Sequence, residues 1–356
     1  MSNSSGKFLI NIREEKNEII NGIKVCLKIN ENLYIADENN DIIIFDIKSK
    51  KKILSINFHN KSITSIHICK KPLFLEKKEL TFTENSFFIL SSSLDHKFAL
   101  HNIFYNNGSL NHKLIAQCKP TNDEINGIIQ IENGQIVVAT RDQSFLVYSN
   151  NITEGKFIKL YDIHKPWPME ARSLFEIKNN LIGICWEYDD AEADLSYDEP
   201  TFELNHSNDG LAIYLIDNKI KEKKVLSRIL ISRKNAFILL EDKFILNYYT
   251  PQFAFELNIK GIGVYNLNNL EFMFKFTYDY FKLNLCPFNK KYFVLLYRES
   301  HEKNKEKINI YDSNTLKNIQ SIEIEIDTNP YKNCLFPIST NEYFFNNYII
   351  NIQEKK

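Results

Sequence analysis

The chain has 356 residues and a formal net charge of -1, with 44 Lys plus Arg against 45 Asp plus Glu. This balance gives no overall basic field, which argues against recruitment of nucleic acid or of an anionic membrane by net charge. Hydrophobic residues make up 44% and aromatic residues 13%, which is enough for a large core and too much for a disordered chain.

The sequence carries no targeting segment that we recognise. The first residues, MSNSSGKFLINIREEKNE, contain no apolar run long enough for a signal peptide, and no apolar stretch of 18 residues occurs anywhere. The six cysteines are scattered and no two have C-x-x-C spacing, which disfavours zinc sites and dithiol redox sites. We expect an intracellular protein without a membrane span, cytoplasmic, with the nucleus left open.

Short apolar runs rich in β-branched and aromatic residues recur along the whole chain, broken by turn residues. Such a pattern predicts consecutive antiparallel strands. Residues 7–12 (KFLINI) form the first expected strand, and seven groups of strands follow it. We place these groups at residues 19–58, 59–119, 120–163, 164–230, 231–277, 278–326 and 327–356.

The second group shows the pattern most clearly. Its first run, SITSIHICK, alternates, so that Ile63, Ser65, His67 and Cys69 are expected on one face of a strand. The next run, SFFILSSSLDHKFALHN, consists of an apolar strand, a Ser-rich corner with Asp95, and a second apolar strand. Together these runs predict one blade of a β-propeller.

The spacing of the repeats supports this fold class. Propeller repeats have periods of about 40–50 residues. The two longest steps contain insertions at residues 72–85 and 187–209, and no helical segment interrupts the series. We therefore predict an all-β, seven-bladed propeller of four-stranded antiparallel blades, as one domain over residues 1–356. The third-strand positions are 56, 47, 66, 51, 46 and 39 residues apart: Phe45, His101, Tyr148, Tyr214, Tyr265, Tyr311 and Ile350.

The last group and the first strand complement each other. Residues 327–356 predict only three strands, whereas residues 7–12 predict one strand that belongs to no group. An open ring would leave unpaired strand edges. We therefore expect the N-terminal strand to complete the last blade and to close the ring.

Several of these segments resemble the WD40-repeat family. SSSLDHKFALHN looks like the small-residue strand, Asp turn and third strand of that family. NDIIIFDIKSKK and EKINIYDSNT look like its third strand, with Phe45-Asp46 and Tyr311-Asp312 in place of Trp-Asp. His59 resembles the His of the family's Gly-His pair, and Asp95 resembles its turn Asp. The resemblance implies that His59 and Asp95 are structural partners whose hydrogen bond fixes the strand corner.

No catalytic or metal-binding motif stands out in the sequence. G-x-S-x-G, H-E-x-x-H and a Gly-rich phosphate loop are all absent. Strand alternation predicts that His96, His101 and His112 are scattered, so we expect no metal site and no cofactor. The run from Asp190 to Asp194 faintly suggests a calcium loop, but Leu195 stands where such a loop needs Gly.

The insertion at residues 187–209 is the strongest candidate for a partner-binding site. It has nine acidic residues and no Lys or Arg. In a four-stranded meander, its turn shares a face with the connection HKPWPME at residues 164–170 and with the turn of the fifth group. Aromatic anchors surrounded by charge are typical of binding hot spots. The candidate residues for docking a basic peptide are Trp167, Tyr188, Asp189, Asp190, Glu192, Asp194, Tyr197, Asp198, Glu199, Phe253 and Phe255.

Two functions are compatible with the sequence. We favour a non-catalytic scaffold that binds other proteins through its loops, without membrane or nucleic-acid partners. The alternative is an enzymatic propeller, a hydrolase or a metal-dependent enzyme, with a site at the central channel. For the acidic insertion, the alternative is a disordered loop above ordinary core aromatics.

Overall fold

The computed structural model describes most of the chain, and all of the regular elements in this part are β-strands. No helix with the length and apolar character of a membrane span occurs among the described residues. The described residues are 2–3, 7–14, 26–30, 32–46, 48–49, 51–80, 83, 85–141, 144–164, 169–188, 210–216, 220–227, 230–231, 237–239, 243–250, 259–269, 271–278, 280–288, 291–299, 305–325, 335–337, 342–345 and 348–355.

The chain divides into two compact units. Unit 1 comprises Met1–Tyr34, Asp46–Lys51 and Ile231–Lys356, and unit 2 comprises Ile35–Phe45 and Lys52–Leu230. One four-stranded sheet, in the order β3-β4-β5-β6, has residues in both units. The single domain over residues 1–356 stays a prediction. The strands of this sheet are β3 (Cys26–Lys28), β4 (Leu33–Glu38), β5 (Asp41–Asp46) and β6 (Lys51–Ile56).

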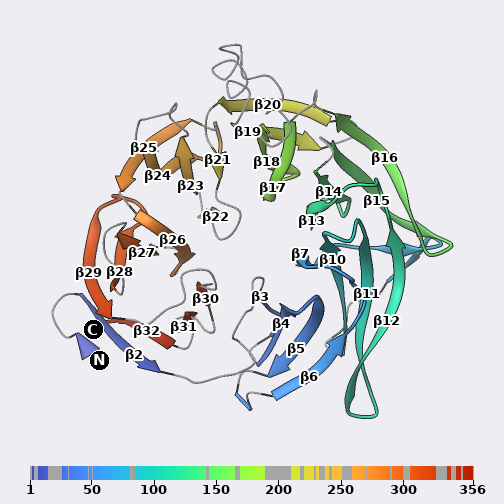
Figure 1. The fold of residues 1–356 in the computed structure, drawn as a ribbon, viewed down its shortest axis with the longest axis horizontal. Coiled ribbons are helices and arrows are strands. Elements are labelled where there is room, and N and C mark those ends of the chain that lie inside the picture. Colours follow the sequence, from blue (N-terminus) through green and yellow to red (C-terminus); the bar gives the residue numbers. More distant parts are fainter. Residues whose placement is uncertain are drawn as a thin grey trace, which may run out of the picture. The chain divides into compact units, whose positions relative to one another are not determined.

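Unit 2 contains three further sheets, in the orders β12-β11-β10-β7, β13-β14-β15-β8-β9 with β16 beside β15, and β17-β18-β19-β20 (Figure 1). We call the first of them the corner sheet. The strands are β7 (Ile63–Ile68), β8 (Phe74–Leu75), β9 (Lys78–Glu79), β10 (Ser86–Ser93), β11 (Phe98–Asn106), β12 (Ser109–Cys118), β13 (Ile125–Gln130), β14 (Ile136–Thr140), β15 (Ser144–Thr153), β16 (Lys156–His164), β17 (Met169–Lys178), β18 (Leu181–Tyr188), β19 (Gly210–Ile216) and β20 (Ile220–Ser227).

Unit 1 also has three sheets, in the orders β1-β2-β32-β31-β30, β21-β23-β24-β25 with β22 beside β23, and β26-β27-β28-β29 (Figure 1). The strands are β1 (Ser2–Asn3), β2 (Phe8–Glu14), β21 (Leu230–Ile231, where unit 2 ends), β22 (Phe237–Leu239), β23 (Lys243–Thr250), β24 (Ile259–Asn266), β25 (Phe272–Tyr278), β26 (Tyr280–Pro287), β27 (Tyr292–Glu299), β28 (Lys305–Asp312), β29 (Asn318–Glu325), β30 (Leu335–Pro337), β31 (Glu342–Phe345) and β32 (Tyr348–Glu354).

The inner strands of unit 2 are buried on both faces. Every residue of β14 (IVVAT) is buried, as are the last six residues of β10 (SFFILSSS). Continuous apolar runs are typical of strands covered on both sides. The last strand of the corner sheet, β12, is instead mostly exposed or half-buried, and its sequence, SLNHKLIAQC, mixes polar and apolar residues.

A β-bulge changes which side chains of β7 are buried. Strict alternation predicts Ile63 and Ser65 on the same face, but Ile63 and Ile66 are the buried residues of this strand. The register with β10 shifts between Ser92 and Ser93, so that Ser92 pairs with Ser65 and Ser93 with Ile63. Thr64 is the extra residue, and the alternation predicted over Ile63–Cys69 is wrong at this point.

The insertion at residues 72–85 joins the neighbouring sheet of unit 2. Its hairpin, β8–β9, pairs in parallel with the second half of β15, with Asn151 opposite Phe74 and Ile152 opposite Leu75. The backbone N–H of Glu76 also donates to the carbonyl of Ile152 at 2.8 Å. The hairpin within this insertion therefore adds two short strands to the next sheet.

A repeated hydrogen-bond pattern links successive sheets of unit 2. The Gln130 side-chain oxygen accepts from the backbone N–H groups of Lys70 and Lys71, each at 3.0 Å. One sheet further, the Glu176 carboxylate accepts from the backbone N–H of Glu132 at 2.8 Å. Gln130 pairs with Ile136 across its turn and Glu176 pairs with Ile182, so the two acceptors occupy equivalent positions in their sheets.

The N-terminal strand lies beside the last strand of the chain in unit 1. β2 pairs antiparallel with β32, from Phe8 opposite Glu354 to Glu14 opposite Tyr348 (Figure 1). The sequence predicts a strand at residues 7–12 in this position, and the strand extends to Glu14. On its other side β2 pairs with β1, which the sequence pattern did not indicate.

Candidate functional site

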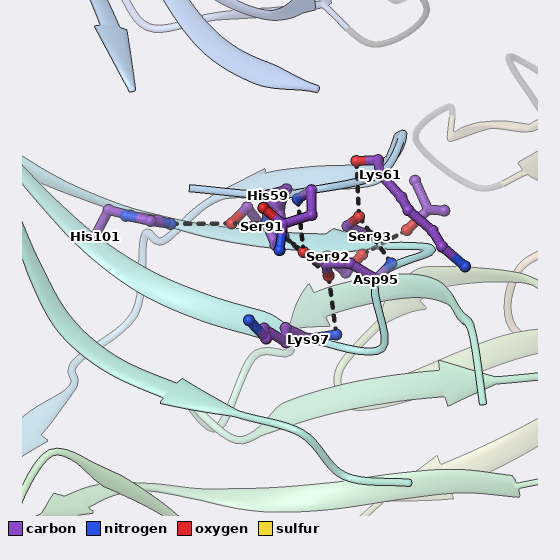
Figure 2. A network of polar contacts seen from close by, with 10 residues as sticks. His59, Lys61, Ser91, Ser92, Ser93, Asp95, Lys97 and His101 are labelled. Carbon is purple, nitrogen blue, oxygen red and sulfur yellow. Dashed lines mark hydrogen bonds and ion pairs between the residues drawn. The ribbon is translucent and has the colours of Figure 1, made fainter. Parts of the chain in front are cut away.

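The corner sheet holds a continuous line of polar side chains, which we call the imidazole relay. His59 follows β6, Ser91 lies on β10, and Asp95 lies in the turn between β10 and β11. Figure 2 shows this corner. The relay consists of five residues: Asp95, His59, Ser91, His101 on β11 and His112 on β12.

The contacts along the relay are all of hydrogen-bond length. His59 Nδ1 lies 3.1 Å from Asp95 Oδ2, and His59 Nε2 lies 2.9 Å from Ser91 Oγ. Ser91 Oγ lies 3.0 Å from His101 Nε2, and His101 Nδ1 lies 2.9 Å from His112 Nε2. The Phe58 ring packs nearly perpendicular to both imidazoles, 4.8 Å from His59 and 5.2 Å from His101 between ring centroids.

Asp95 also fixes the backbone of the corner. Its carboxylate accepts from the backbone N–H of Asn60 at 3.0 Å. It also accepts from the backbone N–H of Lys97 at 3.1 Å (Figure 2). Ser93 Oγ donates to the carbonyl of Lys61 at 2.9 Å and accepts from the N–H of Asp95 at 3.1 Å. These bonds attach the connection before β7 to the β10–β11 turn, because both bond the same few side chains.

The environment sets the charge of the relay at neutral pH. Burial alone would raise the pKa of Asp95, but the N–H of Asn60, the contact with His59 and the N–H of Lys97 outweigh it and hold the pKa below its usual value. Burial lowers the pKa of His59, although Asp95 opposes this effect. Burial, together with His112 and His59, lowers the pKa of His101 to about 3. Asp95 is therefore ionised and the imidazoles are neutral.

This charge state fixes the direction of every bond in the relay. An ionised carboxylate only accepts, so His59 Nδ1 must carry the proton and donate to Asp95. His59 Nε2 then has a free lone pair and accepts the Ser91 hydroxyl proton. Ser91 Oγ consequently accepts from His101 Nε2. His101 Nδ1 accepts in turn from His112 Nε2, so all donors point toward Asp95.

The first three members of the relay have the connectivity of a catalytic triad. In such triads a carboxylate contacts Nδ1 of a His whose Nε2 faces a Ser hydroxyl. Here, however, Ser91 is 0% exposed, His59 3% and Asp95 8%. The Ser91 hydroxyl also bonds two imidazoles at once. The hydroxyl is therefore buried and committed to two hydrogen bonds in this arrangement.

The structure brings His59 and Asp95 together, the two residues that the WD40 resemblance selects. Their purely structural role stays a prediction. Most of the proposed partner-binding residues lie outside the described part of the chain. Tyr188 is the last residue of β18, and only its backbone is described. The residues outside the described part are Trp167, Asp189, Asp190, Glu192, Asp194, Tyr197, Asp198, Glu199, Phe253 and Phe255.

The expected scatter of the histidines is wrong for His101 and His112. The hairpin between β11 and β12 turns at Asn107 and Gly108, whose φ values of 51° and 77° lie in the left-handed region. An Asn-Gly pair is the strongest sequence signal for a two-residue hairpin turn. That turn places Ile103 opposite His112, so that His101 is its diagonal neighbour on the same face. The Asn-Gly pair was therefore the signal that could have found this contact.

Other reactive groups do not assemble into a site in the described residues. No group of three or more His, Cys, Asp or Glu side chains in this part of the chain could hold a metal ion. Cys69, Cys118 and Cys286 do not form disulfides. Burial raises the pKa of the Cys69 thiol, and burial also raises that of Cys118, so both are poor nucleophiles at neutral pH.

The comparisons with known proteins bear on the fold only. No protein-family model matches this sequence, and no curated protein matches it significantly. The crystal structure of the WD40 domain of SCAP from fission yeast is similar, with a TM-score of 0.56 and 10% sequence identity. The match covers 93% of this chain and 84% of that chain. The chain therefore has a WD40-like β-propeller fold.

Proposed function

We propose that this protein is a non-catalytic WD40-like scaffold that binds other proteins through its loops. Its seven blades form a ring that the N-terminal strand closes. The β2–β32 pairing and the seven sheets of the described residues support this arrangement. We place the scaffold in the cytoplasm, with the nucleus as the alternative compartment, which a fluorescent fusion in the source cell distinguishes.

The observation that carries the non-catalytic function is the burial of the Asp95–His59–Ser91 constellation. It is the one arrangement with the connectivity of a hydrolase site that we find in the described residues. Its serine hydroxyl is inaccessible and bonded on both sides. In this proposal the Asp95–His59–Ser91 hydrogen bonds stabilise the blade. The residues that bind partners then lie on the loops, where binding residues are commonly found.

A reactive-serine probe tests the enzymatic alternative directly. An activated fluorophosphonate labels nucleophilic serines that a solvent-accessible His–Asp pair activates. We expect no labelling of Ser91 in the folded protein. Labelling of wild type that Ser91→Ala abolishes, while a denatured sample stays unlabelled, would show an active hydrolase and overturn the scaffold.

We propose the acidic insertion and Trp167 as the docking site for a basic peptide or basic protein face. The support is the nine acidic residues within 187–209 and the aromatic residues among them. Opposite charge would steer a basic partner to this surface, and the aromatic side chains would anchor it. Binding of this kind weakens as salt concentration rises.

Affinity purification from the source cell followed by mass spectrometry tests this site. The variants are a deletion of residues 189–209 and Trp167→Ala. A third variant keeps the loop length and removes only charge, by changing Asp189, Asp190, Glu192, Asp194, Asp198 and Glu199 to Asn or Gln. We expect loss of the same partners from all three, and stronger retention by wild type in low salt. If every folded variant retains every partner in low salt, the docking site does not exist.

A further inference from the structure

The imidazole relay ends at a half-buried histidine. His112 lies on β12, the last strand of the corner sheet, and is more accessible than His101 and His59, which are buried. Its Nε2 proton is committed to His101, so its Nδ1 is the atom left to take up a further proton. Protonation of His112 thus keeps the existing bond, because Nε2 continues to donate.

The next imidazole cannot accept a proton in the same way. A proton on His101 Nδ1 would place two N–H groups face to face across the present 2.9 Å contact. His101 could then be charged only if this bond broke. The other side of His101 is also committed, because Nε2 donates to Ser91. A charged His101 would still donate from Nε2 to Ser91, but it would be 0% exposed, and the carboxylate of the relay, Asp95, lies beyond Ser91 and His59. Opening of the corner would bring this charge to water.

The charged groups around the relay do not make it easier for His101 to take up a proton while its bond to His112 is intact. At the buried end they are Asp95, which favours a charged His59, and Lys97, which disfavours it. From β11, His101 is the titratable group that faces His112. β16 also packs against β12, and it carries Lys156, Lys159 and Asp162, the last two paired with each other at 2.9 Å.

We propose that the imidazole relay is an acid-sensitive latch, in which the His101–His112 bond keeps the corner closed at neutral pH and releases it on acidification. Burial lowers the pKa of His112, as it does that of His101 and His59. A histidine whose pKa is lowered by folding leaves the closed state intact above about pH 6.5 and weakens it as pH falls below that value. The latch is independent of which partner the scaffold binds.

Hydrogen exchange at the corner measures the latch. The amides of Asn60 and Lys97 donate to Asp95, so their opening constants report the corner itself. After correction for intrinsic exchange rates, we expect opening in wild type to rise between pH 7 and pH 5, by about tenfold per pH unit for each proton taken up. His112→Gln keeps a donor to His101 and can turn its amide to accept instead. We expect opening at pH 5 to be about tenfold lower in this variant than in wild type.

His67→Gln is the matched control. His67 lies on β7 of the same sheet but is not a member of the relay. Burial, and to a lesser extent the charge of Lys70, lowers the pKa of His67 to about 4. We expect its opening constants to rise with acid as steeply as those of wild type. If both variants flatten the dependence equally, or if neither does, general burial of histidine explains the effect and the latch is refuted.

Nitrogen-15 spectra of histidine-labelled wild type test the same proposal without relying on a variant. At pH 7 we expect the proton on Nδ1 of His59 and on Nε2 of both His101 and His112. These tautomers are the ones that the direction of the bonds requires. A proton on Nδ1 of His101 at neutral pH would contradict the latch.

Discussion

The side-chain amide of Gln320 pairs with both backbone polar groups of Phe8. Gln320 Oε1 accepts from the N–H of Phe8 at 2.8 Å, and Gln320 Nε2 donates to its carbonyl at 3.1 Å. Gln320 lies on β29 and Phe8 on β2, 312 residues apart in sequence. The side chain thus bonds to β2 as a backbone peptide group of a neighbouring strand would, and it ties the N-terminal strand to the sheet β26-β27-β28-β29.

Gln320→Ala is expected to destabilise the protein. It leaves the N–H and carbonyl of Phe8 without their partner in a buried position, at a cost of about 1–3 kcal/mol for each unpaired group. Chemical denaturation measures the change in the free energy of unfolding. Gln353→Ala is the matched control, since Gln353 lies exposed on β32 and its replacement should be nearly neutral. Equal effects of the two substitutions would contradict the role of Gln320.

Removal of residues 1–12 should expose the outer side of β32. In the intact chain, Ile10 and Ile12 of β2 lie opposite Ile352 and Ile350. Without them, the apolar core that includes Phe8 and Ile10 is opened and an unpaired edge is left for other chains. We expect a lower melting temperature and concentration-dependent self-association, measured by thermal unfolding and light scattering. A truncated protein that stays monomeric and melts like wild type would refute the closure by the N-terminal strand.

Asp95→Ala should lower stability without changing partner binding. It leaves the N–H groups of Asn60 and Lys97 and the Nδ1 proton of His59 without an acceptor. Hydrogen bonds to a charged group contribute about 1.5–3 kcal/mol each, so we expect a loss of at least about 2 kcal/mol in the free energy of unfolding. Partner binding is then compared per folded molecule below the melting temperature. Binding lost at unchanged stability would make Asp95 a contact residue.

Much of the fold follows from local sequence patterns. The predicted all-β class and WD40-like propeller fold are confirmed by the likeness to a solved WD40 domain. Strand groups were identifiable because apolar runs such as Ile136–Thr140 end at turn residues, and periodicity is a local property. The seven-bladed ring and its closure stay predictions.

Features that depend on long-range register were not predictable. The bulge at Thr64 moves Ile63 to a different face, and no residue in this run indicates that a bulge occurs there. The β8–β9 hairpin joins the next sheet through Phe74 opposite Asn151, a pairing of residues that are 77 positions apart in the chain. The relay could be predicted in part, because His59 and Asp95 follow from the WD40 resemblance and the Asn-Gly turn would bring His101 near His112. The contact of Ser91 with both His59 and His101 requires the register of β10 against its neighbours.

Glu176→Gln is expected to stabilise the protein at neutral pH. Burial raises the pKa of Glu176, and the nearby Glu132 also raises it, against the opposing effects of the Glu132 N–H and of Lys71. A carboxyl whose pKa is raised by folding costs nothing below its unfolded pKa of about 4.5 and destabilises the folded state as pH rises through its folded pKa. Gln keeps the oxygen that accepts from the Glu132 N–H, and Gln130 already fills the equivalent position one sheet earlier. The free energy of unfolding, measured from pH 4 to pH 8, should therefore be equal in wild type and variant at the acid end and higher in the variant at pH 7.

The converse change, Gln130→Glu, places a carboxyl at a 2% exposed position and removes the donor to the Lys71 carbonyl, so it should cost about 1–3 kcal/mol or more at pH 7. A Glu176→Gln variant that is less stable than wild type at pH 7 would show that the charge on Glu176 holds the two sheets together.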